Sequence, residues 1–463
     1  MAVFTVRELL KFGSPRQDVE LRGWVKTRRD SKNLSFLEVN DGSCRSSVQV
    51  VVDSLSPARA VLQDATPGAS LRVNGDFVRS PNGKEQDFEL KADRMELYGR
   101  CDPETYPIQK KKTSDEFLRT VAHLRPRTNK YAAMLRIRSE LSHAIHTFFR
   151  NNGFFYVHTP IITASDCEGA GQMFQVSALD METPPRTADG KVDFFRDFFG
   201  KKTFLTVSGQ LEGEALAAAL GRIYTFGPTF RAENSNTYRH CAEFWMIEPE
   251  AAFFTLEDDM ALAENFLKSI VSHTVENCPE DIGLFSKFVD TSLMKTLANI
   301  TDNTFERLTY ADAVEILQKH NDKFETKISY GQDLGSEHER FMVEQVFKKP
   351  VILHDKPKSL GAFYMKLGDD GKTVRGMDVL VPRIGEIIGG SERENRLDVI
   401  RQKMADFKIR EEDYWWYIDL RRFGTVPHSG FGLGFERVMM LLTGIGNIRD
   451  VTAFPRVPNY AEF

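Results

Sequence analysis

The sequence predicts an α+β protein in which a small N-terminal β-barrel precedes a much larger domain of strands and helices. Three observations support this fold class. The chain has 463 residues, too many for one ordinary core, so two or three domains are expected. Short alternating segments fill the first hundred residues, whereas helical spacing of apolar residues begins after residue 130. Between these patterns lies a stretch with three prolines and a lysine run, so we predict a barrel over 1–104, a linker over 105–131 and the large domain over 132–463.

The composition is that of an ordinary globular protein, with 41% hydrophobic and 27% charged residues. A net charge of -5 gives no global attraction to nucleic acid, so any RNA contact must come from local basic patches. The five cysteines show no CxxC spacing, which argues against a zinc site or a disulfide framework. The N-terminal residues have no signal-peptide core, and no apolar run approaches the roughly 20 residues of a membrane helix. We therefore expect a soluble cytoplasmic protein that does not contact a membrane.

Five strand-like segments make up the predicted barrel. The sequences "NDG" and "PNG" supply turns between them, and a single helical segment, "SPARAVLQDAT", intervenes. This pattern fits an OB-fold, a barrel often used to bind nucleic acids, although a purely structural β-domain fits the pattern equally well. The five segments are 19–29, 34–43, 46–53, 69–80 and 86–100.

Basic and aromatic residues are interleaved on the first three predicted strands. Basic residues can contact phosphates, and an aromatic ring can stack on a splayed base of single-stranded RNA. A basic cluster is more often a solvated face, but the barrel pattern makes RNA binding an equal interpretation. The residues are Arg22, Trp24, Lys26, Arg28 and Arg29 on the first strand, Phe36 on the second and Gln49 on the third.

The large domain contains three groups of residues with chemical potential. In the first, apolar residues recur at helical spacing from Met134 to Phe148, and the helix is expected to end at Gly153. A strand containing Pro160 follows, and then a loop with Asp166 and Glu168. Alone, this pattern is typical of a core helix and an edge strand.

The second group lies between Phe230 and Glu250, where charges occur on strand-like apolar sequence. The segments "RIYTFGPTFRAE" and "AEFWMIEPEAAF" predict a hairpin, whose side chains two apart share a face. An arginine fork suits a phosphate, an aromatic face a purine, and carboxylates suit amines or metal-bound phosphates. A salt-bridge network on the sheet is the alternative, but the density of charge favours a pocket. The residues expected on the shared face are Arg231, Glu233, Phe244, Met246, Glu248 and Glu250.

The third group is "HSGFGLGFERVMMLLTG", in which alternate glycines let the backbone approach a ligand or another strand closely. Glu436 and Arg437 then open a helix. No βαβ unit follows, which excludes a dinucleotide-binding loop. The segment "GDDGKT" is not a phosphate loop either, because Lys366 stands where the first glycine is required.

Together, the three groups resemble the three signature motifs of class II aminoacyl-tRNA synthetases. They correspond to the long helix and strand ending in Pro160, to the "FRxE…RH…EF" hairpin and to the "GxGxGxER" strand and helix. The HIGH and KMSKS hallmarks of the other class are absent. An N-terminal barrel is similar to the subclass that charges aspartate, asparagine and lysine. The resemblance covers nearly the whole chain and implies a catalytic domain built on an antiparallel β-sheet flanked by helices.

Within that subclass, "TASDCEGAGQMF", "FLTVSGQLEGE", "GEIIGGSERE" and "LRRFGTVPHSGFGLGFER" resemble the bacterial asparaginyl-tRNA synthetases. Where aspartyl members typically carry a lysine that neutralises the substrate carboxylate, this chain has Gly213, and Glu248 replaces a shorter aspartate. A carboxylate in the pocket accepts hydrogen bonds from an amide NH2 but repels a carboxylate. The resemblance therefore implies a ligase that joins L-asparagine to tRNA(Asn) through asparaginyl-adenylate. An aspartyl enzyme, an ammonia-using asparagine synthetase and a non-catalytic RNA-binding paralogue remain as alternatives.

The resemblance also implies roles for individual residues. Arg231 and Arg437 would be catalytic, on the α- and γ-phosphates of the substrate ATP, and no general base would be needed, because alignment and electrostatic stabilisation suffice. The first motif implies a homodimer, and the segment from Leu179 to Lys202 is expected to be an ordered insertion near the pocket, with a closing lid as an open alternative. The other implied residues are Glu233, His240, Phe244, Glu386 and Gly434 for ATP; Glu168, Gln210, Glu248 and Arg393 for asparagine; Asp378 and Glu386 for Mg²⁺; and Arg28, Phe36 and Gln49 for the anticodon.

Overall fold

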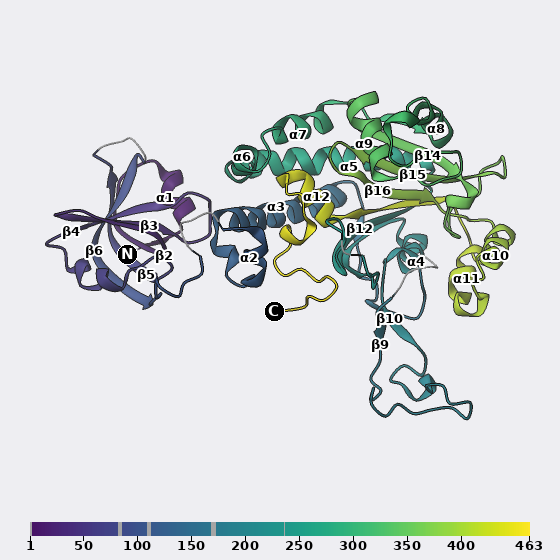
Figure 1. Ribbon diagram of the computed structural model, residues 1–463, viewed down its shortest axis with the longest axis horizontal. Helices are drawn as coiled ribbons and strands as arrows, with labels where there is room; N and C mark the ends of the chain where they lie inside the picture. The colour runs from purple at the N-terminus through teal and green to yellow at the C-terminus, as the bar shows by residue number, and fades with distance from the viewer. Residues whose placement is uncertain (1, 82–85, 109–112, 168–172, 236) are drawn as a thin grey trace. The chain divides into compact units, whose positions relative to one another are not determined.

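The computed structural model describes residues 2–81, 86–108, 113–167, 173–235 and 237–463 (Figure 1). The chain divides into two compact units, Met1–Leu135 and Arg136–Phe463, and the boundary lies within helix α3 (Asn129–Asn151). The predicted linker contains the short helix α2 (Asp115–Thr120).

The first unit contains the predicted five-stranded barrel. The strands follow the order β2-β3-β4-β6-β5, and β5 pairs back onto β2, which closes the barrel. Only β4 and β6 pair in parallel among these five strands. The intervening helical segment is the 3-10 helix η1 (Pro57–Asp64), and alternating valines and leucines of the strands fill the core. The strands are β2 (Arg16–Asp30), β3 (Leu34–Asn40), β4 (Val48–Asp53), β5 (Ser70–Arg79) and β6 (Phe88–Gly99).

Two N-terminal elements were not predicted from the sequence. Strand β1 (Ala2–Phe4) pairs in parallel with β2, and helix α1 (Val6–Phe12) begins with a capping box between Thr5 and Glu8. Both elements are too short for their periodicity to be distinguished from a coil.

A β-bulge interrupts the pairing of β2 with β3 between Val25 and Thr27. A bulge adds one residue to one strand, so the alternation of side chains between the two faces shifts beyond it. Arg29 consequently lies opposite Phe36, and Arg28 lies opposite the buried Leu37.

The second unit is built on an eight-stranded sheet with the order β13-β14-β15-β16-β17-β12-β11-β7. Its six inner strands are antiparallel, as predicted, but the edge pairs β13–β14 and β7–β11 are parallel, so the sheet is mixed. Parallel neighbours need long crossover connections, and helices α8 and α9 supply one between β13 and β14. The strands are β7 (Phe155–Tyr156), β11 (Arg222–Phe230), β12 (Glu243–Ala252), β13 (Glu306–Thr309), β14 (Val351–Pro357), β15 (Thr373–Val381), β16 (Gly385–Glu392) and β17 (His428–Gly434).

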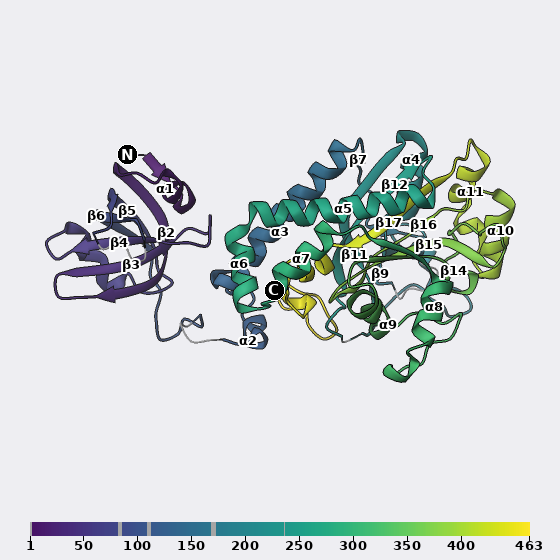
Figure 2. The same ribbon diagram turned by 90° about the horizontal axis from the view of Figure 1, so that it is seen from above.

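Helices flank this sheet. Figure 2 shows α5 lying along the sheet, where it packs against β15, β16 and β17, while α4 packs against β11 and β12. None of the helices that the structure describes is long and apolar enough to cross a membrane. The helices are α4 (Gln210–Leu220), α5 (Leu256–Asn277), α6 (Pro279–Phe288), α7 (Leu293–Asp302), α8 (Tyr310–Gln318), α9 (Ser336–Phe341), α10 (Leu397–Asp406), α11 (Trp415–Arg422) and α12 (Phe435–Thr443).

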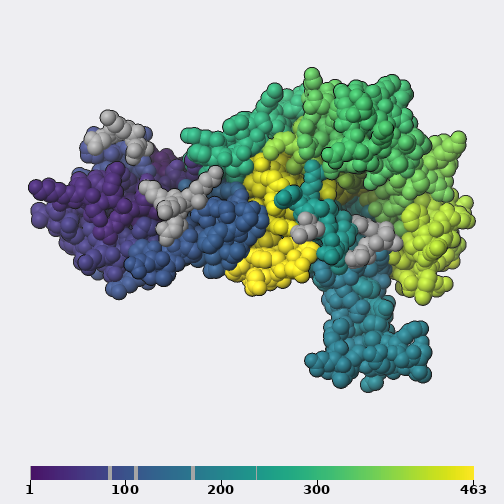
Figure 3. Space-filling model, in the orientation of Figure 1, coloured from purple at the N-terminus to yellow at the C-terminus, as the bar shows by residue number. Residues whose placement is uncertain are grey.

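The insertion that follows β9 forms an arm that projects from this unit (Figure 3). Its base is a small sheet of β8 (Ile162–Thr163), β10 (Thr203–Leu205) and β9 (Gln175–Val176). The buried carboxylate of Asp197 holds the arm together by accepting hydrogen bonds from Ser177 Oγ at 2.7 Å and Ala178 N at 2.9 Å.

Candidate active site

A cavity of about 360 Å³ lies in the second unit, between the hairpin β11–β12, strands β15 to β17 and the start of α12. Every site residue that the sequence predicts in this unit lines it, with one exception: Glu168 lies outside the described residues. The tertiary structure thus brings together residues from five separate sequence segments. They are Gln210, Arg231, Glu233, His240, Phe244, Glu248, Asp378, Glu386, Arg393, Gly434 and Arg437.

The register of the hairpin explains how its charges reach the cavity. Thr229 pairs with Phe244 and Thr225 pairs with Glu248, so alternate β12 residues from Phe244 to Glu250 share one face. Arg231 follows the last paired residue of β11, and its amide donates to the carbonyl of Ala242 at 2.9 Å. Its guanidinium carbon lies 5.3 Å from the centroid of the Phe244 ring. A cation and an aromatic plate therefore stand together at this end of the cavity.

The alternate glycines of β17 serve the approach of a neighbouring strand. A Cβ at Gly430 would collide with the Glu250 carboxylate, and one at Gly432 would lie 2.7 Å from Cε of Met246. Strand β12 can pair with β17 and still place large side chains over it only because these positions lack a side chain.

Glu248 is held rigidly against the cavity wall. One of its carboxylate oxygens accepts hydrogen bonds from the amide of Gly209 and from Oγ1 of Thr225, both at 3.0 Å, and the other accepts from Ser208 Oγ. The residue is 4% exposed, so a ligand meets a carboxylate whose position is already fixed.

Arg393 is paired with Glu250 at the floor of the cavity. Its Nε donates to Glu250 Oε2 at 3.2 Å, its Nη2 donates to Glu250 Oε1, and its Nη1 donates to Ser391 Oγ at 2.8 Å. These contacts use three of the five N–H donors of the guanidinium. Sequence reasoning placed Glu250 on the cavity face but did not identify it as the partner of Arg393.

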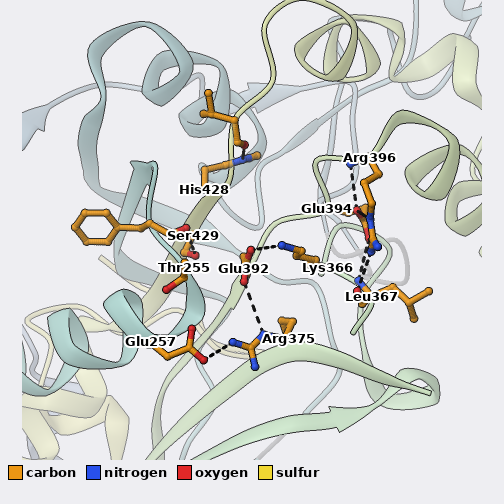
Figure 4. Close-up of polar contacts among 12 residues, drawn as sticks. Thr255, Glu257, Lys366, Leu367, Arg375, Glu392, Glu394, Arg396, His428 and Ser429 are labelled. Carbon is orange, nitrogen blue, oxygen red and sulfur yellow. Dashed lines mark hydrogen bonds and ion pairs between the residues drawn. The ribbon is translucent and has the colours of Figure 1, made fainter. Parts of the chain in front are cut away.

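Figure 4 shows the contacts of Glu392 and Glu394, the residues on either side of Arg393. The buried Glu392 pairs with Lys366 and lies 3.8 Å from Nε of Arg375. Glu394 accepts a hydrogen bond from the amide of Leu367 at 2.9 Å and pairs with Arg396. Both flanking carboxylates therefore tie the end of β16 to the segment around Lys366.

A buried network lies behind Gln210. Its Nε2 donates to Glu214 Oε1 at 3.2 Å, and the same carboxylate accepts from Tyr417 at 2.9 Å, Arg421 at 2.8 Å and His428 Nε2 at 2.9 Å. Burial opposes the charge of Glu214, but Arg421 and His428 outweigh it and hold the pKa of this carboxyl below its ordinary value. Sequence reasoning missed the network because its members are far apart in the chain.

Asp378 and Glu386 converge above the backbone of Gly389, where a Cβ would lie 3.0 Å from Glu386 Oε1 and 3.7 Å from Asp378 Oδ1. Lys356 forms an ion pair with Asp378. Burial raises the pKa of Asp378 to about 6 although the Lys356 ammonium opposes this. Among the described residues no three His, Cys, Asp or Glu side chains are grouped closely enough to hold a metal ion. Two hard oxygen donors facing one small space nevertheless fit Mg²⁺, which keeps several other ligands of its own.

Glu339 of α9 is a third carboxylate beside this pair, and it lies in no motif. Its Oε2 accepts a hydrogen bond from the amide of Glu386 at 3.1 Å. Burial raises the pKa of Glu339 to about 7, and Glu386 and Asp378 add to the effect. Arg437 lies across the same corner, donating from Nη1 to the Glu386 carbonyl at 3.0 Å.

The predicted anticodon residues lie on the barrel. Phe36 and Gln49 share its outer face, because Gln49 pairs with Glu38, two residues after Phe36. Arg28 forms an ion pair with Asp30 at 3.0 Å and also donates to the Leu62 carbonyl. Arg29 instead lies over the Phe36 ring, 5.1 Å from its centroid. The bulge in β2 gives this position to Arg29, which the sequence placed in the basic cluster of the first strand but not among the anticodon residues.

A further buried acid lies on α5. Asp259 is fully buried, and neither carboxylate oxygen has a hydrogen-bond partner among the described residues. Burial raises the pKa of this carboxyl well above its ordinary value. The folded protein therefore keeps a proton that the unfolded chain loses above about pH 4.

We expect Asp259→Asn to remove a pH dependence of stability. Above about pH 4 the unfolded state binds fewer protons than the folded state, so the wild-type free energy of unfolding falls as pH rises, by up to about 1.4 kcal/mol per pH unit from this group. The variant lacks that slope, which urea unfolding at several pH values measures. Glu276→Gln, at an exposed position of the same helix, is the control and should keep the wild-type slope. An unchanged slope in Asp259→Asn would show that the carboxyl is ionised in the folded state.

Comparison with known proteins gives the same picture for both units. Residues 114–458 match a family model described as tRNA synthetases class II (D, K and N), and residues 19–98 match an OB-fold nucleic acid binding domain. An asparagine--tRNA ligase of Oleidesulfovibrio alaskensis is 57% identical over 458 residues, with 99% of each chain covered. One from Nostoc is 56% identical over 459 residues, again with 99% of each chain covered. The crystal structure of asparaginyl-tRNA synthetase from Pyrococcus horikoshii complexed with asparaginyl-adenylate matches with a TM-score of 0.86 at 30% identity, covering 100% of this chain and 99% of its own.

Proposed function

Because this chain belongs to the class II tRNA synthetases of the D, K and N group, we propose that it acts as an asparagine--tRNA ligase. It activates L-asparagine with ATP to form asparaginyl-adenylate and pyrophosphate, and then transfers the asparaginyl group to tRNA(Asn). The observation that carries the proposal is the convergence of arginines, an aromatic ring and carboxylates in one cavity, where they could bind phosphates, a purine and an amide.

In the first step, a carboxylate oxygen of asparagine attacks the α-phosphorus of ATP, and the bond to the bridging oxygen breaks to release pyrophosphate. Phe244 stacks on adenine, and Arg231 beside it neutralises the charge that develops on the α-phosphate. Arg437 holds the γ-phosphate, and His240 and Glu233 contact the nucleotide. Alignment of two charged substrates supplies the rate enhancement, so no proton transfer is required.

In the second step, a hydroxyl oxygen of the terminal ribose of tRNA attacks the carbonyl carbon of the adenylate. The bond to the phosphate oxygen breaks, and AMP and a proton are released. Gln210, fixed by Glu214, holds the asparaginyl group during both steps.

Asparagine is selected by charge. Glu250 and Arg393 neutralise each other, which leaves the fixed carboxylate of Glu248 as the charge that faces the substrate side chain. It accepts from the amide NH2 and repels a carboxylate, while Arg393 donates to the amide oxygen. Gly213 supports this assignment, because a Cβ at this position would lie 3.6 Å from Cγ of Glu250, and this chain places no cation there to attract a substrate carboxylate. Glu168 is proposed to bind the α-ammonium group.

Asp378 and Glu386 would hold Mg²⁺. A divalent cation at this position supplies charge neutralisation for the phosphates of ATP. Lys356 balances Asp378 from the buried side, and Glu339 fixes the backbone of Glu386.

The outer face of the barrel is proposed to bind the anticodon of tRNA(Asn). Phe36 stacks on a base and Gln49 donates to a base edge. Arg28 is proposed to contact the RNA as well, but its charge is paired with Asp30, whereas Arg29 lies over the Phe36 ring.

We expect Phe36→Ala to raise the KM for tRNA by about 10- to 100-fold, because base stacking on an aromatic side chain is worth roughly 1–3 kcal/mol. Asparagine-dependent ATP–pyrophosphate exchange needs no tRNA and should be unchanged, so it is the internal control. Equal loss of both activities would place Phe36 in the fold of the barrel rather than in the RNA contact.

We also propose that the protein works as a cytoplasmic homodimer. Four apolar residues around β7 support the dimer, because they are between 40% and 57% exposed in the single chain. They are Phe155, Tyr156, Ile161 and Ile162. Light scattering should give twice the mass of one chain, and a monomer at micromolar concentration would contradict the proposal.

The test of the function is ATP–pyrophosphate exchange with asparagine, aspartate and lysine, each without tRNA. Exchange with asparagine alone is expected. Exchange with aspartate at comparable efficiency would point to an aspartyl enzyme, and no exchange with any amino acid would favour the RNA-binding paralogue. Formation of asparagine from aspartate and ammonia would reveal an asparagine synthetase.

A further inference from the structure

A second cavity, of about 250 Å³, adjoins the first. Its lining includes four arginines, Arg239, Arg340, Arg383 and Arg437, together with Tyr238 and apolar residues at the end of α12. Among the described residues that line it there is no carboxylate. The volume of this cavity is smaller than the roughly 300 Å³ at which sites for drug-sized ligands begin. A small, strongly cationic cavity suits a compact anion.

The cations of this cavity are only partly balanced by the protein. Oε1 of Glu344 lies 3.7 Å from Nε of Arg340, and Oε2 of Glu386 lies 3.6 Å from Nη1 of Arg437. Arg239 donates to the neutral hydroxyl of Ser336 at 3.0 Å. Burial lowers the pKa of Arg239, and the nearby charges of Arg437 and Arg340 lower it further against the opposing effect of Glu339. An anion that binds between cations crowded in this way lowers their electrostatic free energy.

The two cavities share Arg239 and Arg437. Arg437 is the residue that holds the γ-phosphate in the proposed reaction, so the second cavity begins where the triphosphate chain of ATP ends. Arg383 is anchored there by an ion pair with Asp290 and a hydrogen bond from Nη2 to the Gly444 carbonyl at 3.3 Å. The Arg340 side chain is 52% exposed, and Glu344 is its one ion-pair partner among the described residues, so its guanidinium can turn toward a ligand.

We propose that this arginine-lined cavity is a binding site for pyrophosphate. The cavity receives pyrophosphate as the leaving group of the first step, before pyrophosphate reaches solvent. The proposal rests on the proposed function. Arg340 and Arg383 are the residues that would distinguish this site from the γ-phosphate position, because they line the second cavity and not the first. Arginine forks suit the oxygens of a phosphate chain.

The test uses Arg340→Ala and Arg340→Glu in the full-length protein. Calorimetric titration with pyrophosphate alone should show about tenfold weaker binding for Arg340→Ala, as expected for the loss of one charged hydrogen bond, and a larger loss for Arg340→Glu. In the exchange reaction the KM for pyrophosphate should rise, whereas the KM for ATP should not change. Arg410→Ala, at an exposed surface arginine of another segment, is the matched control and should behave as wild type.

Two outcomes would overturn the proposal. Unchanged pyrophosphate binding in both Arg340 variants would show that the cavity does not hold the anion. An equal rise of the KM for ATP would show that Arg340 belongs to the binding of the substrate triphosphate and that no separate site exists. Titration with inorganic phosphate separates a general anion site, which would bind both ligands alike, from the proposed pyrophosphate site. Absence of asparagine-dependent exchange in the wild type would contradict the proposed function, whereas the titration needs no turnover and reports on the site independently.

Discussion

Replacement of Arg231 by alanine is expected to lower the rate of asparagine-dependent ATP–pyrophosphate exchange by about 10²- to 10³-fold, as for the loss of one preorganised donor to a developing anionic charge. The backbone of Arg231 is fixed to Ala242, and its guanidinium lies beside the Phe244 ring. The cation is thus in position before ATP binds. Because its contact strengthens as charge develops on the α-phosphate, the loss should appear mainly in kcat.

Two controls separate this effect from damage to the fold. Arg222→Ala changes an exposed arginine at the start of β11, the strand that Arg231 follows, and should retain exchange activity. Arg231→Lys keeps the charge but loses the planar fork, so it should recover only part of the rate. If Arg231→Ala raised the KM for ATP and left kcat unchanged, Arg231 would bind the nucleotide without stabilising the transition state.

The second large effect is expected in stability. Glu214→Ala should lower the free energy of unfolding by about 3–5 kcal/mol, because it leaves the charge of Arg421 buried without the carboxylate that neutralises it. Both side chains are fully buried, and Tyr417 and His428 lose the same acceptor. Urea unfolding measures the change. The KM for asparagine should rise as well, since Gln210 loses the group that orients it.

Glu315→Ala is the matched control for this prediction. Glu315 pairs with Lys319 on the surface of α8, where both side chains are more than half exposed, and such pairs contribute only about 0.3–0.5 kcal/mol. If Glu214→Ala cost no more than Glu315→Ala, the buried network would be dispensable for the fold. Glu214→Gln keeps the shape of the side chain and should fall between the two variants.

Much of the architecture followed from local patterns in the sequence. Alternating valines and leucines predicted the five barrel strands, and helical spacing from Met134 to Phe148 predicted α3. These predictions succeeded because burial of one face imposes a period of two on strands and of 3.6 on helices. The hairpin from Phe230 to Glu250 could be predicted for the same reason, and its alternation correctly placed Phe244 and Glu248 on one face.

Motifs also identified which residues gather in the cavity, but not how they are held. Glu250 had been placed on the cavity face, yet its pairing with Arg393 joins positions 143 residues apart. Glu339 and Lys356 come from α9 and β14, and neither stood in a motif. Ion pairs of this kind depend on distances in space, and no periodicity records them.

The barrel gives the clearest case in which tertiary structure overruled the sequence. Regular alternation from Trp24 would have placed Arg28 on the face of Phe36, whereas the bulge after Val25 gives that place to Arg29. The parallel edges of the large sheet are a second such case. The direction in which β7 and β13 pair depends on the long connections that follow them and not on the sequences of the strands. Periodicity thus determined which residues form strands and which faces are buried, while register, bulges and long-range ion pairs were decided only when distant segments packed together.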